Sequence, residues 1–148
     1  MKKSQLSKRD IKEILLNFPQ AQISKKDRAE LIDNSIVILN DKPLFFLKDS
    51  KYIPTLRQVM DNDLGLKKIS VDSGAIPFVI KGADIMRPGI TRIDDGIEID
   101  DFVIIVDNTH GKPLAIGQAL YDSENLKKST SGKVIRNLHY VGDSIWTM

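Results

Sequence analysis

Apolar residues recur at helical spacing near the start of the chain. Ser7 and Asp10 form a start similar to a capping box, with Asp in place of the usual Glu. The apolar positions that follow have the spacing of one helix face: Ile11, Ile14, Leu15 and Phe18. Pro19 comes next, and proline cannot continue a helix. The pattern therefore predicts a helix that begins after Ser7 and ends before Pro19.

Short apolar runs separated by turn residues follow this helix. Three of them predict strands: 29–32, 35–39 and 44–47. The segments between them are rich in Asp, Asn and Pro, which is the composition of tight turns. A hairpin or meander is therefore expected. Pro54 then lies near the start of a second predicted helix, in which Leu56, Val59 and Met60 share one face.

The second half, after a domain boundary expected at about residue 67, contains mostly strand patterns. The predicted strands are 69–71, 102–106, 114–121, 134–141 and 144–146. The run 102–106 is continuously apolar, which indicates a strand covered on both faces. In 114–121 large residues alternate with Ala and Gly, so one face is small and lets another element, most simply the preceding helix, pack closely.

That helix is predicted between the first two of these strands. Asp72 or Ser73 is placed to cap it, and Gly82 is placed to end it. A single helical turn is predicted at 122–126. Five or six short, mostly antiparallel strands with one main helix predict a small closed or nearly closed barrel. The fold class is therefore α+β, with a small α+β domain at 1–67 and the barrel at 68–148.

Composition limits the functions that remain. The chain of 148 residues has no Cys, which excludes disulfides, thiolate nucleophiles and cysteine-based metal centres. Its apolar stretches are far shorter than the roughly 20 residues of a membrane helix. Charged residues at 8–10 lie where a signal peptide needs an apolar core. We expect a cytoplasmic protein that spans no membrane.

Catalytic motifs are missing from the sequence. His110 lies in a predicted turn and His139 in a predicted strand, and neither has Ser or Asp at a recognisable motif spacing. The sequence contains no Gly-x-Ser-x-Gly, no His-Glu-x-x-His and no complete phosphate-binding loop. We therefore expect no catalytic residue, no cofactor and no metal.

One acidic cluster raises the alternative of a bound cation: Asp94, Asp95, Glu98, Asp100 and Asp101. It lacks the Gly and the terminal Glu of a calcium-binding loop at the required spacing. A solvated loop between barrel strands is the favoured interpretation.

The segment from Gly82 to Gly89 offers a different kind of site. Two glycines, Ala83 and a rigid Arg87-Pro88-Gly89 turn follow a helix directly, so the backbone can come close to a ligand. Lys81 and Arg87 bracket this lip. The alternative is an ordinary helix end followed by a type II turn, with cations that are merely solvated.

Residues 71–90, Val-Asp-Ser-Gly-Ala-Ile-Pro-Phe-Val-Ile-Lys-Gly-Ala-Asp-Ile-Met-Arg-Pro-Gly-Ile, resemble the signature helix and loop of the PUA domain. This module is shared by pseudouridine synthases and archaeosine transglycosylases. Residues 115–119 are similar to its central strand, and 137–140 with 143–146 to its closing strands. The resemblance covers about residues 69–148.

Upstream segments resemble a second, smaller domain. Pro43 to Phe46 and Tyr52 to Arg57 are similar to the pre-PUA domain of the malignant-T-cell-amplified-sequence and ligatin proteins, which act with the ribosome in translation initiation and recycling. The chain is thus similar to an archaeal-type member of that group, with a pre-PUA domain followed by a PUA pseudo-barrel. Eukaryotic members work with a SUI-type factor domain, which we expect a partner to supply.

The resemblance implies a non-catalytic protein that recognises structured RNA, either tRNA or rRNA, on the small ribosomal subunit. The residues expected to contact RNA allow close backbone approach or provide positive charge: Gly74, Ala75, Lys81, Gly82, Ala83, Arg87, Gly89, Lys127, Lys128, Lys133 and Arg136. The formal net charge of +2 divides into +5 for 1–70, from 14 Lys+Arg and 9 Asp+Glu, and −3 for 71–148, from 8 and 11. We therefore expect a local contact with modest salt dependence.

Two alternatives remain open. In the first, the protein is an adaptor whose N-terminal domain docks on a ribosomal or initiation-factor protein through Phe45, Phe46, Tyr52 and Arg57. Because neighbouring strand residues point to opposite faces, one of Phe45 and Phe46 is then expected to face outward or toward the second domain. In the second, the chain guides RNA to a separate RNA-modifying enzyme.

Overall fold

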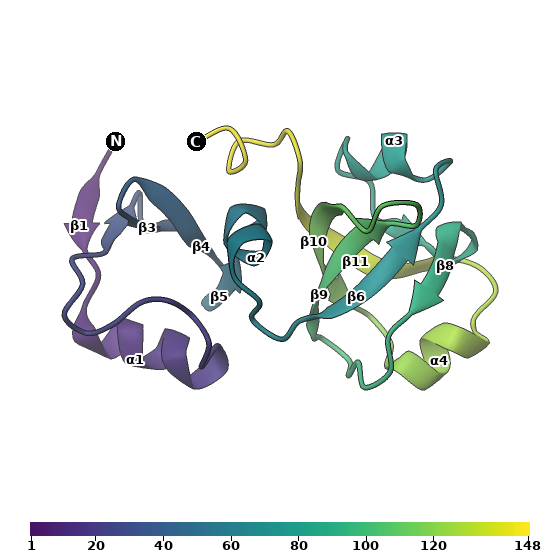
Figure 1. The fold of residues 1–148 in the computed structure, drawn as a ribbon, viewed down its shortest axis with the longest axis horizontal. Helices are drawn as coiled ribbons and strands as arrows, with labels where there is room; N and C mark the ends of the chain where they lie inside the picture. Colours follow the sequence, from purple (N-terminus) through teal and green to yellow (C-terminus); the bar gives the residue numbers. More distant parts are fainter. The chain divides into compact units, whose positions relative to one another are not determined.

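The computed structural model describes residues 1–148, which divide into two compact units (Figure 1). Unit 1 comprises Met1–Gly65 together with Met148, and unit 2 comprises Leu66–Thr147. Unit 2 begins at Leu66, whereas the sequence predicts a domain boundary at about residue 67. None of the helices has both the length and the apolar character that crossing a membrane requires.

Unit 1 contains a five-stranded antiparallel sheet in which each strand pairs with its neighbour in sequence. The strands are β1 (Lys3–Gln5), β2 (Glu30–Ile32), β3 (Ile36–Leu39), β4 (Lys42–Lys48) and β5 (Lys51–Pro54). The helices are α1 (Lys8–Asn17) and α2 (Leu56–Asp61). The predicted meander is confirmed as β2 to β4. The strand β1 was not predicted because its side chains are all polar, and only backbone pairing with β2 makes it a strand.

The first helix forms as its sequence predicts. The Ser7 side chain accepts a hydrogen bond from the Asp10 backbone N–H at 3.1 Å, which caps α1. Ile11 and Ile14 are buried on its inner face. Phe18 ends the helix and its ring lies 5.4 Å from the ring of Phe45, measured between centroids. The hydrophobic contact thus fixes α1 to the sheet.

In unit 1 the prediction that Met60 shares the apolar face of its helix with Leu56 is wrong, and of the two alternatives for Phe45 and Phe46 the outward one does not hold. Phe45 and Phe46 are both buried, at 0% and 5% exposure, so neither faces outward. Residues 43–46 of β4 are all buried, which means that both faces of this strand are covered. In α2 the buried residues are Leu56 and Gln58, whereas Met60 is exposed. A polar residue is buried there because Gln58 Nε2 donates a hydrogen bond to the Leu44 carbonyl at 2.9 Å.

Unit 2 is a six-stranded sheet in the order β7-β11-β10-β9-β6-β8. Its strands are β6 (Lys67–Val71), β7 (Ile85–Met86), β8 (Ile90–Ile93), β9 (Phe102–Asp107), β10 (Pro113–Ala119) and β11 (Lys133–Tyr140). Its helices are α3 (Ile76–Val79), the 3₁₀ turn η1 (Arg87–Gly89) and α4 (Ser123–Lys128). All pairs are antiparallel except β6 with β9.

The two edge strands of this sheet are consecutive in the chain. β7 and β8 are joined only by η1, so the sheet curls until its edges come close and forms a pseudo-barrel. β7 and β8 escape prediction because they are only two and four residues long. The Arg87-Pro88-Gly89 turn is a 3₁₀ turn, and Gly89 has no positive φ, so the type II turn of the alternative interpretation does not form here.

Two other elements of unit 2 differ from the sequence pattern. The predicted helix 73–82 is α-helical only over Ile76–Val79, flanked by turns on both sides. Pro77 lies in its first turn, where proline is tolerated. The expected closing strand 144–146 is a turn, because the Trp146 backbone N–H donates to Asp143 Oδ1 at 2.9 Å.

The core of unit 2 explains the small residues of β10. Ala115 and Ala119 are fully buried within the hydrophobic cluster, and α3 contacts β10 as predicted. Gly117 is required for another reason, since a Cβ at this position would lie 2.5 Å from Ile135 Cγ2 and 3.1 Å from the Arg136 carbonyl oxygen. The continuously apolar strand β9 is buried from Val103 to Asp107, as predicted for 102–106.

Candidate functional site

An apolar groove of about 790 Å³ lies on unit 2, beside α3, β7 and η1. We call it the α3 groove. Its lining residues are Asp72, Gly74, Ala75, Phe78, Val79, Ala83, Asp84, Ile85, Met86, Pro88, Gly89 and Lys133. The groove therefore includes five of the residues predicted from sequence to contact RNA, namely Gly74, Ala75, Ala83, Gly89 and Lys133.

Two large apolar side chains flank the α3 groove and are open to solvent. Phe78 is 66% exposed and Met86 is 51% exposed. Both lie on short elements, α3 and β7, that are fixed to the barrel through their buried neighbours Val79 and Ile85. Rigid elements thus present a flat ring and a flexible thioether at the same groove, an arrangement that suits a planar apolar ligand surface.

The lip of the groove is held by β11. The Asn137 side-chain amide donates to the carbonyls of Val79 and Ala83, both at 3.0 Å. The Asn137 backbone N–H donates to Asp84 Oδ1 at 2.9 Å. The Asn137 Oδ1 atom is buried and has no hydrogen-bond partner. One residue of the barrel therefore fixes both ends of the segment from Val79 to Asp84.

Glycines in and beside the lip serve internal packing. Gly82 has a left-handed backbone, with φ of +94°, and a Cβ there would lie 2.9 Å from the Tyr140 ring. At Gly89 a Cβ would lie 3.0 Å from the Ala75 Cβ. The close approaches predicted from sequence thus occur between parts of the fold.

Two of the side chains predicted to contact phosphate, those of Arg87 and Lys133, already interact with other groups of unit 2. Arg87 Nε donates to the Leu126 carbonyl at 2.8 Å, and its Nη1 donates to the Ile90 carbonyl at 3.3 Å. Lys133 Nζ lies 3.4 Å from Asp84 Oδ2. Arg87 therefore ties η1 to its neighbours, and Lys133 balances the carboxylate inside the groove.

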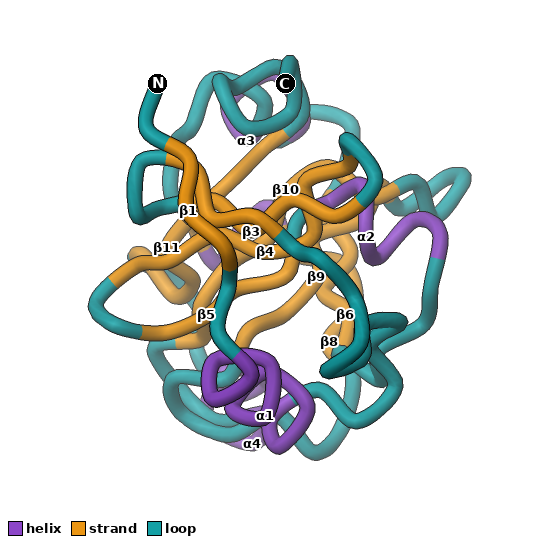
Figure 2. The backbone as a smooth tube through the Cα atoms, turned by 90° about the vertical axis from the view of Figure 1, so that its left-hand side faces the viewer, coloured by secondary structure: helices purple, strands orange, loops and turns teal.

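The other predicted cations are not brought together. Lys127 and Lys128 lie on α4, which is at the opposite end of unit 2 from α3 (Figures 1 and 2). Lys127 pairs with Asp95, and Lys128 Nζ lies 3.0 Å from Glu124 Oε1. Lys81 and Arg136 are exposed and form no ion pair.

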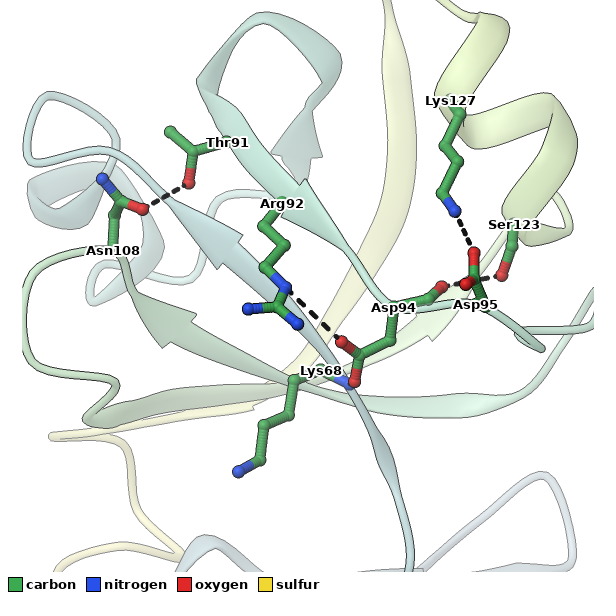
Figure 3. Close-up of polar contacts among 8 residues, drawn as sticks. All are labelled: Lys68, Thr91, Arg92, Asp94, Asp95, Asn108, Ser123 and Lys127. Carbon is green, nitrogen blue, oxygen red and sulfur yellow. Dashed lines mark hydrogen bonds and ion pairs between the residues drawn. The ribbon is translucent and has the colours of Figure 1, made fainter.

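The acidic cluster is used to hold loops of the barrel (Figure 3). Asp94 Oδ2 accepts a hydrogen bond from the Lys68 backbone N–H at 2.8 Å, and the Asp94 carbonyl accepts one from Ser123 Oγ at 2.9 Å. Arg92 Nε lies 4.0 Å from Asp94 Oδ1. Lys127 lowers the pKa of Asp95 by donating a hydrogen bond to it and through its charge. No set of three or more His, Asp or Glu side chains is placed to hold a metal ion.

Neither histidine lies in the groove lining. His110 is exposed in the turn after β9, where its backbone N–H and that of Lys112 hold the pKa of Asp107 below its usual range. His139 is fully buried, and its Nδ1 lies 2.8 Å from Asp143 Oδ2. Burial lowers the pKa of His139, although Asp143 acts in the opposite direction.

The residues expected to dock a partner lie in unit 1 and are mostly buried. Phe45, Phe46 and Tyr52 are all less than a tenth exposed. Burial, followed by the charge and hydrogen bond of Asp10, raises the pKa of Tyr52 to about 12. Arg57 is half-buried. The aromatic rings of these residues therefore offer little surface for a partner to contact.

Sequence reasoning missed Phe78, Met86 and Asn137 as parts of the site. Phe78 was assigned to the helix that packs on the barrel, and Met86 belongs to a strand too short to predict. Asn137 contacts residues more than 50 positions earlier in the chain. The sequence carried no local signal for these three positions, because Pro77 in the first turn of α3 is compatible with a longer helix.

Comparison with known proteins bears on the family and the fold of the chain. The family model described as PUA domain matches residues 67–141. An uncharacterized protein of Methanocaldococcus jannaschii is 40% identical, over 95% of this chain and 93% of its own length. Translation machinery-associated protein 20 of Eremothecium gossypii is 34% identical, over 92% of this chain and 76% of its own.

A third relative is malignant T-cell-amplified sequence 1 of Rattus norvegicus, 32% identical over 84% of this chain and 72% of its own. Among solved structures, a hypothetical protein of Pyrococcus horikoshii superposes with a TM-score of 0.85 at 34% identity. That match covers 99% of this chain and 98% of the other. The likeness therefore extends over both units.

Proposed function

Because the chain belongs to the PUA-domain family, and within it to relatives associated with the translation machinery, we propose that it binds structured RNA without catalysing a reaction. The RNA is a tRNA or an rRNA, and the protein acts in initiation or recycling on the small ribosomal subunit, with any SUI-type domain supplied by another chain. The α3 groove is the proposed RNA site.

The apolar character of the α3 groove is the observation that carries this proposal. Phe78 and Met86 stand exposed at a groove whose single cation, Lys133, is already paired with Asp84. Phosphate would find little positive charge there, whereas an unstacked base would find an aromatic face. We therefore infer that the groove takes an unpaired nucleotide at the end or bulge of a structured RNA.

The surroundings of the groove support recognition of the adjoining helix. Lys81 and Arg136 are exposed, unpaired cations on the elements that carry the lip, and they are the unit 2 cations proposed to meet phosphates. Asn137 holds the lip in place before RNA arrives, which lowers the entropic cost of binding. The remaining predicted glycines and Arg87 contribute by shaping the lip.

Binding to two RNAs tests the proposal: a hairpin with a single-stranded 3′ extension and the same hairpin with a blunt end. We expect the wild-type protein to prefer the extended RNA. Phe78→Ala is expected to weaken its binding by about tenfold or more, since stacking on an aromatic ring contributes about 1–3 kcal/mol per base. This variant should also lose the preference for the hairpin with the 3′ extension over the blunt hairpin.

The matched control is Ile99→Ala, another exposed apolar residue of unit 2, which is not part of the groove lining. It should bind as the wild type does. Equal loss in both variants, or equal binding of both RNAs by the wild type, would refute the proposed site. Crosslinking in cells followed by sequencing of the attached RNA would then distinguish tRNA from rRNA.

A further inference from the structure

Positive charge in unit 1 is concentrated in its first 28 residues. They hold eight Lys and Arg against three Asp and Glu. Residues 29–65 hold four against six. The excess of positive charge therefore belongs to β1, α1 and the segment that leads into β2, and the rest of the unit is slightly acidic.

The outer side of α1 displays part of this charge. The helix buries Ile11 and Ile14, whereas Arg9 and Lys12 lie away from both around the helix axis, and Lys8 lies at the border of the buried face, one turn before Ile11. All three cations are exposed. Leu16 lies on the same side and is 74% exposed, so no element of the protein covers this side of α1.

Backbone pairing adds a fourth cation. β1 pairs with β2 so that Gln5 lies opposite Glu30, and the Leu6 N–H donates to the Ala29 carbonyl at 2.9 Å. Because Arg28 directly precedes Ala29 in the chain, this hydrogen bond brings its backbone close to the start of α1. Figure 2 shows the chain passing from β1 directly into α1. We call Lys8, Arg9, Lys12 and Arg28 the cationic face.

None of these four side chains forms an ion pair or a hydrogen bond within the protein. Asp10 accepts a hydrogen bond from Ser7 Oγ at 2.8 Å, Asp27 Oδ2 accepts one from the Ser24 backbone N–H at 2.7 Å, and Asp10 and Glu13 both raise the pKa of Tyr52. None of these three carboxylates forms an ion pair with a cation of the face. The cationic face keeps its full charge for a ligand from outside.

We infer that the cationic face binds the sugar-phosphate backbone of RNA, as a second contact separate from the α3 groove. This inference rests on the proposed function. The groove has an apolar surface and a paired lysine, so it supplies little of the attraction that a polyanion requires. Four exposed cations without an ion pair, three on α1 and one in the segment that leads into β2, supply that attraction without base specificity.

The dependence of RNA affinity on salt concentration distinguishes the two contacts. The test variant is Lys8→Gln with Lys12→Gln and Arg28→Gln, in the full-length chain, measured on the hairpin with a 3′ extension. Removing three phosphate contacts should reduce the slope of log K against log salt by about two to three units. Affinity at about 0.15 M salt should fall at least about tenfold.

A second triple variant controls for the loss of net charge. Lys67→Gln, Lys68→Gln and Lys112→Gln remove the same three charges from exposed residues of unit 2 that form no ion pair. Its slope should stay within about one unit of the wild-type value. Thermal unfolding of both triple variants should match the wild type, because all six side chains are exposed.

The outcomes separate this inference from the proposed function. If Phe78→Ala weakens RNA binding but the test variant keeps the wild-type salt slope, the inference that the cationic face binds RNA is wrong. The proposal that the α3 groove binds RNA is then still supported. Equal slopes in the two triple variants also overturn it, because only general electrostatics would remain. A test variant that binds RNA normally but loses a ribosomal protein would show a protein ligand instead. A wild type that binds no RNA refutes both.

Discussion

The two units of this protein differ in how many of their cations are held by groups within the fold. In unit 2, Lys127, Lys128 and Lys133 lie against carboxylates, and Arg87 donates to backbone carbonyls. In unit 1 Lys42 is paired with Asp61, and the four side chains of the cationic face form no ion pair. Counting charges therefore misleads: what matters for a polyanion is which cations the fold leaves unpaired.

This difference in free positive charge also suggests that the two units have different roles in RNA binding. An apolar groove on a tightly packed barrel suits recognition of one unstacked base, and a charged face on a small sheet suits attraction to the backbone. Groove variants should change affinity at every salt concentration, whereas face variants should change the salt dependence.

Gly117→Ala should have the largest effect, because the barrel has no room at this position. The new Cβ would lie 2.5 Å from Ile135 Cγ2 and 3.1 Å from a backbone oxygen that cannot move aside. We expect a loss of about 2–4 kcal/mol in the free energy of unfolding, measured by urea denaturation. Gly74→Ala is the control, since its Cβ would meet only Asp72 Oδ1 at an ordinary 3.4 Å. Similar losses in both would contradict this account.

Asn137→Ala should loosen the lip without changing any charge. It removes both side-chain hydrogen bonds to the Val79 and Ala83 carbonyls and should cost about 1–3 kcal/mol of stability. RNA affinity should fall while the salt slope stays at its wild-type value. Hydrogen exchange at Ala83 and Asp84 should increase. A reduced salt slope would show that the groove and its lip contribute to phosphate binding after all.

Acid should weaken unit 2 through His139. Burial lowers the pKa of this residue in the folded protein below its ordinary value of 6.5. As the pH falls through 6.5, the unfolded chain therefore takes up the proton first, and stability present above that pH is lost. His139→Gln should flatten the decrease of the melting temperature between about pH 7 and 5. A decrease as steep as in the wild type would exclude His139 as its cause.

The smallest effect is expected at a hairpin turn of unit 1. Asp49 and Ser50 join β4 and β5 with φ values of +51° and +62°, which Gly adopts more readily than Ser. Ser50→Gly should raise the free energy of unfolding by about 0.5–1 kcal/mol. Ser73→Gly is the control, because Ser73 has no positive φ and should gain nothing. If both variants are equally stable, left-handed strain in this turn is negligible.

Much of the fold could be predicted from local pattern. The Ser7 cap and the spacing of Ile11 and Ile14 specify α1, and the continuous apolar run of β9 specifies a buried strand. The strands β1 and β7 could not be predicted, because their pairing energy comes from residues distant in the sequence. The position of the lip could be predicted from Gly82 and Gly89, but its apolar groove depends on which side of α3 the barrel leaves open.

The sequence by itself determined the family, the two-part α+β organisation and the segment that forms the lip, because these depend on residue types at fixed local spacing. The tertiary structure alone decided which cations are free. Lys133 is neutralised by Asp84, 49 residues earlier in the chain, and Lys127 by Asp95. Lys8 and Arg28 meet no carboxylate. Electrostatic energy depends on distance in space, and folding sets that distance independently of separation along the chain.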